Sequence, residues 1–310
     1  MEDSSFDLSQ TFTFRGQHIR YGTMGSGDPL VLLHGTPFSS LVWRRIAPLL
    51  AMHRRVYYFD LLGYGRSEKQ PGQDVSLGVQ NQLFAALLEE WGLERPDVVA
   101  HDFGGTTALR THLLNGRDYR TLTLIDPVAL SPHGSALVQT VRRHPDAFTE
   151  LPGYIHEAIL RAYIAGAAHR PLREAEMAHY LEPWLGEVGQ PAFYRQIAQM
   201  SDRHTDEIQD RYDQIRCPVT IVWGEHDTWV PIEQGRRLAQ RIPDADFYTV
   251  PETGHLLAED SPETVIAIVL EAIDQRGAQA LALTSGSRVA SSTPTNPSTA
   301  RKPRATPTPI

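Results

Sequence analysis

The sequence predicts an α/β protein with a mostly parallel central sheet, helices on both faces of the sheet and an inserted helical cap. Short β-type runs alternate with helix-type runs along most of the chain, the alternation breaks once in favour of helices, and the composition changes near the end. Strict alternation requires crossover connections, which leave neighbouring strands parallel. We predict a core over 1–130 and 213–276, a cap over 131–212 and a disordered tail over 277–310.

The strands and helices are predicted from the periodicity of their apolar residues. Strands are expected at 12–14, 18–24, 29–35, 54–60, 97–102, 121–126, 218–224 and 246–252. Helices of the core are expected at 43–51, 80–91, 105–114, 233–242 and 263–273. In the predicted cap, helix-type runs follow one another at 135–144, 152–168, 173–185 and 192–200. Open α/β sheets bind ligands at the carboxyl ends of their strands, so the cap should enclose a pocket there.

Composition and charge argue against several classes of partner. Lys and Arg number 29 against 37 Asp and Glu, and no basic stripe is present, which argues against nucleic acid. The single cysteine, Cys217, cannot form an internal disulfide. The N-terminus lacks the pattern of a secretory signal, and no apolar run approaches the roughly 18 residues of a membrane span. We therefore expect a cytoplasmic protein that acts on a small molecule and binds no membrane.

The tail differs in composition from the rest of the chain. From Gly277 onward the sequence consists mainly of Ala, Ser, Thr and Pro, with four basic residues and no acidic residue. A segment of this kind buries too little apolar surface to offset the entropy lost on ordering. The sequence therefore predicts disorder from Gly277 to the end of the chain.

The run VVAHDFGGTTALR at 98–110 is the clearest sign of catalytic chemistry. A β-type run passes directly into a helix-type run, with Ala100 and Gly104 placed two residues before and two after Asp102. Small residues at this spacing are typical of a strained strand-turn-helix elbow, in which larger side chains would collide. The elbow would present Asp102 as a nucleophile. The alternative is an ordinary aspartate that caps the following helix.

Two further residues follow in the order nucleophile, acid, histidine. Asp227 lies in GEHDTWVP, after the predicted strand 218–224, and His255 lies in PETGHLLAEDSPE, between the last strand and the last helix. This order predicts a triad in which the acid orients the histidine and the histidine activates water. Asp126, at the end of the strand before, is an alternative acid.

The run PLVLLHGTPF supplies a further part of the predicted site. A predicted strand ends in His34 and Gly35, and the backbone N–H groups of Thr36 and Phe103 are expected to form an oxyanion hole. His34 and His101 are interpreted as residues that support these loops by hydrogen bonds and do not titrate in catalysis.

Together these motifs resemble the α/β-hydrolase superfamily, and within it the epoxide hydrolases and haloalkane dehalogenases, whose nucleophile is an aspartate. HGTP, DLLGYGRSEK, AHDFGG, WGEHDTWVP and TGH stand in the family's order between about Phe12 and Ile273. The resemblance implies the α/β-hydrolase fold and favours Asp227 over Asp126 as the acid. We expect no cofactor and no metal ion. Phe103 departs from the family, because this branch usually has Trp there.

An aspartate nucleophile changes the class of substrate. A serine that attacks a saturated carbon leaves an ether, whereas a carboxylate leaves an ester that water can cleave. The expected substrates therefore carry an electrophilic saturated carbon, as epoxides and alkyl halides do. A departing halide is helped by indole N–H donors, which Phe103 does not provide, so an apolar epoxide is the preferred substrate.

Epoxide opening needs a hydrogen-bond donor on the ring oxygen, and the related hydrolases use cap tyrosines, one of them in an aromatic-Tyr-Arg context. PAFYRQI resembles that context and nominates Tyr194, with Tyr154, Tyr163 and Tyr180 as second donors. The alternative is that Tyr194 only packs within the cap. Substrate-binding positions are predicted at Trp184, Trp229 and Tyr154.

Two other functions are kept open at this point. One is a haloalkane dehalogenase. The other is a cofactor-free member of the same fold that catalyses a ring opening, a cyclisation or a lyase step in a biosynthetic pathway, or that merely binds a ligand.

Overall fold

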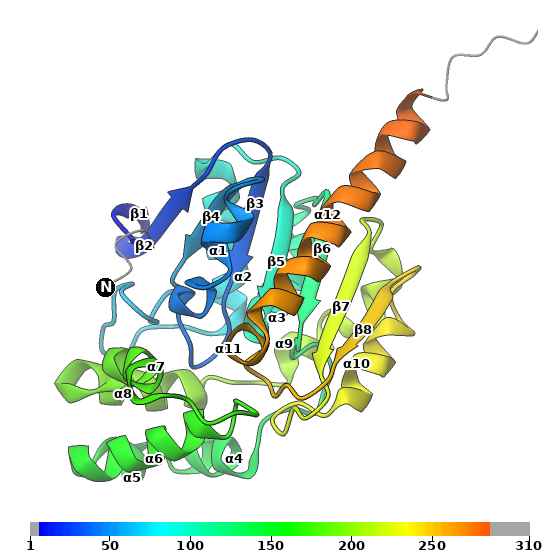
Figure 1. The fold of residues 1–310 in the computed structure, drawn as a ribbon. Helices are drawn as coiled ribbons and strands as arrows, with labels where there is room; N and C mark the ends of the chain where they lie inside the picture. The colour runs from blue at the N-terminus through cyan, green and yellow to red at the C-terminus, as the bar shows by residue number, and fades with distance from the viewer. Residues whose placement is uncertain (1–5, 286–310) are drawn as a thin grey trace, which may run out of the picture.

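The computed structural model describes residues 6–285 and contains an eight-stranded sheet in the order β1-β2-β4-β3-β5-β6-β7-β8 (Figure 1). The strands are β1 (Gln10–Phe14), β2 (Gln17–Met24), β3 (Pro29–Leu33), β4 (Arg55–Phe59), β5 (Asp97–His101), β6 (Thr121–Ile125), β7 (Val219–Gly224) and β8 (Asp246–Val250). Only the pairings of β1 with β2 and of β2 with β4 are antiparallel; the other five are parallel. The eight predicted strands and the mostly parallel sheet are confirmed.

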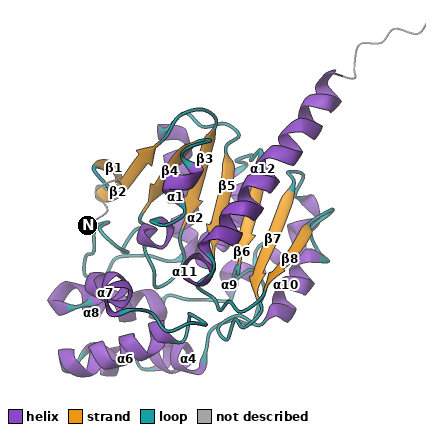
Figure 2. Ribbon diagram, in the orientation of Figure 1, coloured by secondary structure: helices purple, strands orange, loops and turns teal. Residues whose placement is uncertain are grey.

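Helices cover both faces of the sheet (Figure 2). The core helices are α1 (Ala47–Leu50), α2 (Leu77–Glu90), α3 (Phe103–Asn115), α10 (Ile232–Ala239), α11 (Leu257–Asp260) and α12 (Pro262–Ser285), with a 3-10 turn, η1 (Ser40–Trp43), before α1. α1 and α12 lie on one face, and α2, α3 and α10 lie on the other (Figure 1). Strands β3, β5, β6 and β7 are almost fully buried, because both of their faces are covered.

A block of helices connects β6 to β7 and lies beyond the carboxyl ends of the parallel strands (Figure 1). It contains α4 (Ala136–Arg143), α5 (Pro145–Thr149), α6 (Gly153–Ala165), α7 (Glu174–Leu181), η2 (Glu182–Trp184), α8 (Gly186–Ala198), α9 (Arg203–Asp206) and η3 (Gln209–Gln214). We call this block the cap. It stands where the sequence predicts one, over the edge at which an open α/β sheet binds ligands.

The end of the chain differs from the prediction. Helix α12 continues to Ser285, nine residues beyond the boundary predicted at 276. The sequence there, GAQALALTS, is rich in Ala and Leu, which favour helix strongly enough to carry the helix past Gly277. The rest of the predicted tail, 286–310, lies outside the described residues. Within the described part, no helix combines the length and the apolar character that a membrane crossing requires.

Candidate active site

The predicted elbow is formed at Asp102, between β5 and α3. Asp102 has φ 52° and ψ −120°, a conformation that non-glycine residues rarely adopt and that often marks functional strain. The turn brings the backbone of Gly104 so close to the β3 loop that a Cβ there would lie 2.6 Å from the carbonyl oxygen of His34. Glycine is therefore required at 104. The geometry is that of a strained turn, and not of an ordinary helix cap, because the Asp102 side chain makes no capping hydrogen bond.

The two carboxylate oxygens of Asp102 have different surroundings. Oδ1 accepts the backbone N–H of Thr36 at 2.7 Å, and the N–H of Phe103 also hydrogen-bonds the carboxylate. These are the two N–H groups that the sequence predicts for an oxyanion hole. Oδ2 lies 3.5 Å from Nε2 of His255. Oδ1 is thus held by the backbone of Thr36, while Oδ2 faces the histidine.

His255 and Asp227 complete the constellation. Nδ1–H of His255 donates to Oδ2 of Asp227 at 2.8 Å, and both side chains are fully buried. The other oxygen of Asp227 accepts the backbone N–H groups of Trp229 at 2.7 Å and of Val230 at 2.9 Å. The loop after β7 therefore fixes the carboxylate, and the carboxylate fixes the orientation of the imidazole.

Asp126, the alternative acid, is bonded differently. Its Oδ1 accepts the N–H of Gly224 at 3.0 Å, and its Oδ2 has no hydrogen-bond partner among the described residues. Burial, reinforced by the negative charge of Asp227, raises the pKa of Asp126 well above its usual range. This shift favours the neutral, protonated form of the Asp126 carboxyl. Of the two acids, Asp227 is the one that hydrogen-bonds the His255 ring.

In the site, the negative charge of Asp102 and the positive charge of His255 each favour the ionised form of the other. Burial by itself would raise the pKa of Asp102, but His255, His101 and the Phe103 N–H outweigh burial and lower it. Burial would lower the pKa of His255, yet Asp227 and Asp102 raise it well above its usual value. At neutral pH the site therefore holds an imidazolium between two carboxylates.

His34 and His101 lie where the sequence places them and act as supports. Nε2 of His34 accepts the backbone N–H of Leu61 at 2.9 Å, and its Nδ1–H donates to the Gly35 carbonyl at 3.0 Å. Nε2–H of His101 donates to the carbonyl of His255 at 2.9 Å. Burial, followed by the nearby His255, lowers the pKa of His101 to about 4, so its ring is neutral at pH 7.

A cavity of about 350 Å³ lies beside Asp102 under the cap. Its wall includes Thr36, Phe103 and Trp229 from the core and Tyr163 and His133 from the cap, and most of the remainder is apolar: Val128, Leu130, Val138, Met200 and Val230. Trp229 stacks on the His255 ring at 5.1 Å between centroids and on Tyr163 at 4.3 Å. The cavity suits a small, mainly apolar molecule.

Three predicted cap residues do not reach this cavity. The Tyr194 hydroxyl is hydrogen-bonded to Nδ1 of His156, 2.9 Å away, and is buried inside the cap. Trp184 is also buried, and its indole N–H donates to the Pro37 carbonyl at 2.6 Å. Tyr154 is 74% exposed. Trp229, in contrast, lines the cavity as predicted.

Tyr163 is the cap tyrosine that lines the cavity with Asp102. Burial and then the negative charge of Asp102 raise the pKa of Tyr163, so its phenol stays protonated at neutral pH. Tyr180, the other tyrosine named as a donor, hydrogen-bonds Glu259 and Arg44 outside the cavity.

A polar contact between cap and core was missed by sequence reasoning. The hydroxyls of Thr36 and Tyr64 both donate to Oε1 of Gln196, at 2.7 Å and 3.1 Å. Tyr64 belongs to the DLLGYGRSEK run and Gln196 follows Tyr194 in the cap by two residues. No local pattern signals this contact, because the two segments are far apart in the chain.

His101, Asp126 and His255 place ligand atoms within 4.8 Å of one another, which is a spacing that metal ions accept. His255 is, however, already bonded to Asp227 and faces Asp102, while His101 donates to the His255 backbone. We therefore interpret these side chains as the surroundings that hold His255 in place, and not as metal ligands.

Comparisons with known proteins show the fold family to which the chain belongs. A family model described as alpha/beta hydrolase fold matches residues 28–262. A crystal structure of an alpha/beta hydrolase fold protein from Burkholderia ambifaria is similar with a TM-score of 0.84 and 53% identity, over 86% of this chain and 98% of that one. The epoxide hydrolase CorEH gives a TM-score of 0.73 at 24% identity, over 85% and 97%, and at that identity the likeness shows the fold alone. A haloalkane dehalogenase from Sphingobium indicum is 30% identical over 198 residues, which are 60% of this chain and 66% of the relative.

Proposed function

Because the chain belongs to the α/β-hydrolase fold family, we propose that it hydrolyses small apolar epoxides through a covalent ester on Asp102. One observation carries the proposal: a carboxylate occupies the elbow, and its Oδ1 already accepts the Thr36 N–H of the expected oxyanion hole, while the Phe103 N–H bonds the same carboxylate. In an ester formed through Oδ2, the carbonyl oxygen would be Oδ1. It would thus lie in the hole before the second step begins.

In the first step Oδ2 of Asp102 attacks a carbon of the epoxide and the ring C–O bond breaks. The ring oxygen leaves as an alkoxide, which a hydrogen bond from the Tyr163 phenol stabilises. The alkoxide becomes a hydroxyl by taking, through solvent, the proton that the His255 imidazolium releases once Asp102 is esterified. The product of this step is a hydroxyalkyl ester of Asp102.

In the second step a water molecule attacks the ester carbonyl carbon, and His255 takes the proton of the water. Negative charge develops on Oδ1 between the N–H groups of Thr36 and Phe103. The bond from the carbonyl carbon to Oδ2 then breaks, and the leaving alkoxide takes the proton back from His255. The product is a diol, and Asp102 is restored with one oxygen from water.

The two steps need opposite protonation states of His255, and esterification supplies the change. In the free enzyme the carboxylates of Asp227 and Asp102 hold the proton on the ring. Esterification removes the charge of Asp102, so the pKa of His255 falls while Asp227 still orients the ring. His255 thus becomes a base at the stage that requires one.

This linkage predicts different pH dependences for the two steps. Ester decay requires neutral His255, so its rate should fall as the pH drops through the pKa of His255 in the esterified enzyme. Ester formation requires ionised Asp102, whose pKa is lowered, so its rate should stay flat between about pH 5 and 8. The two rates are measured by stopped flow and chemical quench with one epoxide. Parallel pH profiles for formation and decay would argue against the scheme.

A second candidate function is haloalkane dehalogenation. The observation in its favour is Trp229, an indole in the cavity wall, together with the similarity to a haloalkane dehalogenase. Against it stands Phe103, which has no N–H to offer a departing halide next to the nucleophile. A screen of aryl and alkyl epoxides beside bromoalkanes decides between the two. Diol release faster than bromide release supports the epoxide hydrolase, and the reverse order favours the dehalogenase.

Tyr163→Phe tests the donor in the first step. The change keeps the ring that stacks on Trp229 and removes only the hydroxyl, so ester formation should slow by about 100- to 1000-fold, the usual cost of losing one preorganised donor. Ester decay should change little, because its charge develops at Thr36 and Phe103. Tyr194→Phe is the matched control, since that hydroxyl bonds His156 within the cap, and it should leave ester formation within about threefold. Equal effects of the two variants would remove Tyr163 from the mechanism.

A further inference from the structure

The cap touches both loops that carry the acid and the histidine through one short segment, residues 166–170, which follows α6. We call this segment the linker. Its contacts are made to the residues directly beside His255 and directly beside Asp227. These contacts involve mainly backbone groups. Because hydrogen bonds are directional, they form only while the linker keeps one position relative to the two loops.

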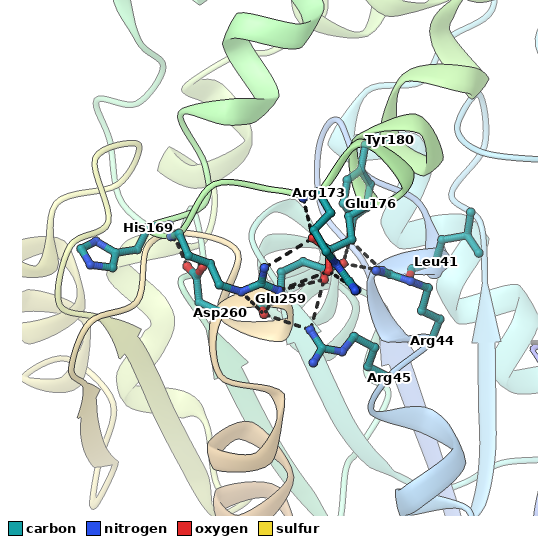
Figure 3. A network of polar contacts seen from close by, with 10 residues as sticks. Leu41, Arg44, Arg45, His169, Arg173, Glu176, Tyr180, Glu259 and Asp260 are labelled. Atoms are coloured by element: carbon teal, nitrogen blue, oxygen red, sulfur yellow. Dashed lines mark hydrogen bonds and ion pairs between the residues drawn. The ribbon is translucent and has the colours of Figure 1, made fainter.

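On the side of His255, the linker holds the residues before and after the histidine. The N–H of Leu256 donates to the carbonyl of Ala167 at 2.9 Å. The carboxylate of Asp260, on α11, accepts the N–H of His169 from the linker at 2.8 Å (Figure 3). The same carboxylate accepts the N–H groups of Arg170, also from the linker, at 3.1 Å and of Gly254 at 2.8 Å. One carboxylate thus ties the residue before His255 to the cap.

The linker packs so closely against Gly254 that no side chain fits there. A Cβ on Gly254 would lie 2.7 Å from the carbonyl oxygen of Ala167 and 2.8 Å from the backbone nitrogen of His169. Both are backbone atoms, which cannot move aside as the end of a flexible side chain can. Glycine before the histidine is therefore needed for the cap to sit against the loop.

On the side of Asp227 the same linker is in contact again. The hydroxyl of Thr228, the residue after Asp227, donates to the Gly166 carbonyl at 3.1 Å. The ring of His169 stacks on His226, the residue before Asp227, with centroids 4.5 Å apart and an interplanar angle of 15°. Residues on both sides of Asp227 are thus held by the segment that holds both neighbours of His255.

A buried ionic cluster fixes α11 next to the linker. Glu259, whose side chain is fully buried, accepts hydrogen bonds from Arg44 of the core and from the Tyr180 hydroxyl of the cap (Figure 3). Its backbone carbonyl accepts Nη2–H of Arg170 at 2.7 Å and Nη1–H of Arg45 at 3.1 Å. Charge-assisted bonds of this kind are stronger and shorter than neutral ones. They anchor the helix on which Asp260 is presented.

We propose that Asp260 is a positioning residue that couples the seating of the cap to the position of His255. The proposal rests on the proposed function in assigning ester decay to His255. Asp260 touches no reacting atom; it acts through Gly254 and the linker. Asp102, in contrast, is held by Thr36 and Phe103, to which Asp260 makes no hydrogen bond among the described residues. Loss of Asp260 should therefore affect the step that needs His255 and spare the step that needs Asp102.

The test is Asp260→Ala, with ester formation and ester decay measured separately in single turnovers of one epoxide. We expect decay to slow by about 10- to 100-fold, because small displacements of a catalytic group carry costs of this size, and formation to stay within about threefold. Asp260→Asn should be intermediate in decay, since a single amide oxygen can still accept the N–H groups of Gly254 and His169. Equal loss in both steps, or no change in decay, would overturn the positioning role.

The matched control is Glu174→Ala, which removes an exposed ion pair to Arg161 in the same cap and should change neither step. A second readout needs no substrate: amide hydrogen exchange over residues 254–260 should be faster in Asp260→Ala than in the wild type, and unchanged exchange would overturn the proposal. If Asp260→Ala does not fold, Asp260→Asn is compared in its place. A wild type that forms no ester with any epoxide would refute the proposed function, while the exchange experiment would still decide the role of Asp260.

Discussion

Replacing Asp102 by asparagine is expected to abolish turnover, with a loss of about 10⁶-fold, the size found when the nucleophile of a triad is removed. The amide has nearly the same shape as the carboxylate and can keep the hydrogen bond from Thr36. Its oxygen is a far poorer nucleophile, however, and no ester should form. The measurement is product formation with the variant in molar excess over the substrate. Slow recovery over hours, with aspartate reappearing at residue 102 by mass, would reflect deamidation and agree with the mechanism.

Asp126→Asn is the matched control for this variant. The same substitution is made in a buried carboxyl at the end of the neighbouring strand, β6. Because burial and the charge of Asp227 raise the pKa of Asp126 and so favour its uncharged form, an amide is a close substitute, and turnover should stay within about tenfold. If Asp102→Asn weakened only the binding of substrate and left turnover intact, Asp102 would be a binding residue and not a nucleophile.

His255→Gln is expected to stop the reaction after the first step. Ester formation depends on Asp102, which keeps its backbone donors, whereas ester decay loses the base that activates water, at a cost of about 10²- to 10⁴-fold. The enzyme should therefore gain the mass of one substrate molecule, located on the peptide that contains Asp102. Intact-protein mass spectrometry in excess epoxide, followed by peptide mapping, makes the measurement.

The control for this variant is His101→Gln. Among residues 6–285, His101 donates to the carbonyl of His255, and a glutamine N–H can replace that bond, so the ester should not accumulate. If His255→Gln is inactive in the steady state but no adduct is trapped, the covalent route is excluded.

Much of the fold could be predicted because alternation along the chain reflects the parallel sheet directly. The runs before Asp102, Asp126 and Asp227 are buried on both faces and are continuously apolar or β-branched. The order of the motifs then placed Thr36, Asp102, Asp227 and His255 at one edge of the sheet. The carboxyl ends of all parallel strands meet at that edge. The position of a motif at the end of a strand can therefore be predicted even when its distant contacts are unknown.

The helices of the cap could be predicted from the sequence, but the side of each helix that faces the cavity could not. Tyr154 and Tyr163 both lie on α6, and at about 100° per residue nine residues turn a helix by a net half turn, so these two side chains point in opposite directions. One of them had to face away from the cavity. Which one does so depends on how α6 packs against the core, and that packing involves residues far away in the chain, such as Trp229.

Tyr194 lies away from the cavity for a related reason. PAFYRQI is an aromatic-Tyr-Arg context, but Tyr194 is directed into the cap, where His156 of α6 bonds its hydroxyl. Only the pairing of α6 with α8 (Gly186–Ala198) creates that partner. In the same way, Trp184 acquires the Pro37 carbonyl as its acceptor only when cap and core meet. The contacts of Asp260 with the linker belong to this class as well.

The central claim is that Asp102 forms a covalent ester with the substrate, and oxygen labelling in a single turnover tests it most directly. The enzyme, in molar excess over one epoxide, is allowed to turn over once in water enriched in oxygen-18. The mechanism predicts a diol that carries no label, because its new oxygen comes from Oδ2 of Asp102, and a mass increase of about 2 Da on the peptide that contains Asp102 as water restores the carboxylate. A labelled diol in that first turnover, with an unlabelled Asp102 peptide, would show that water attacks the epoxide directly and would contradict the account.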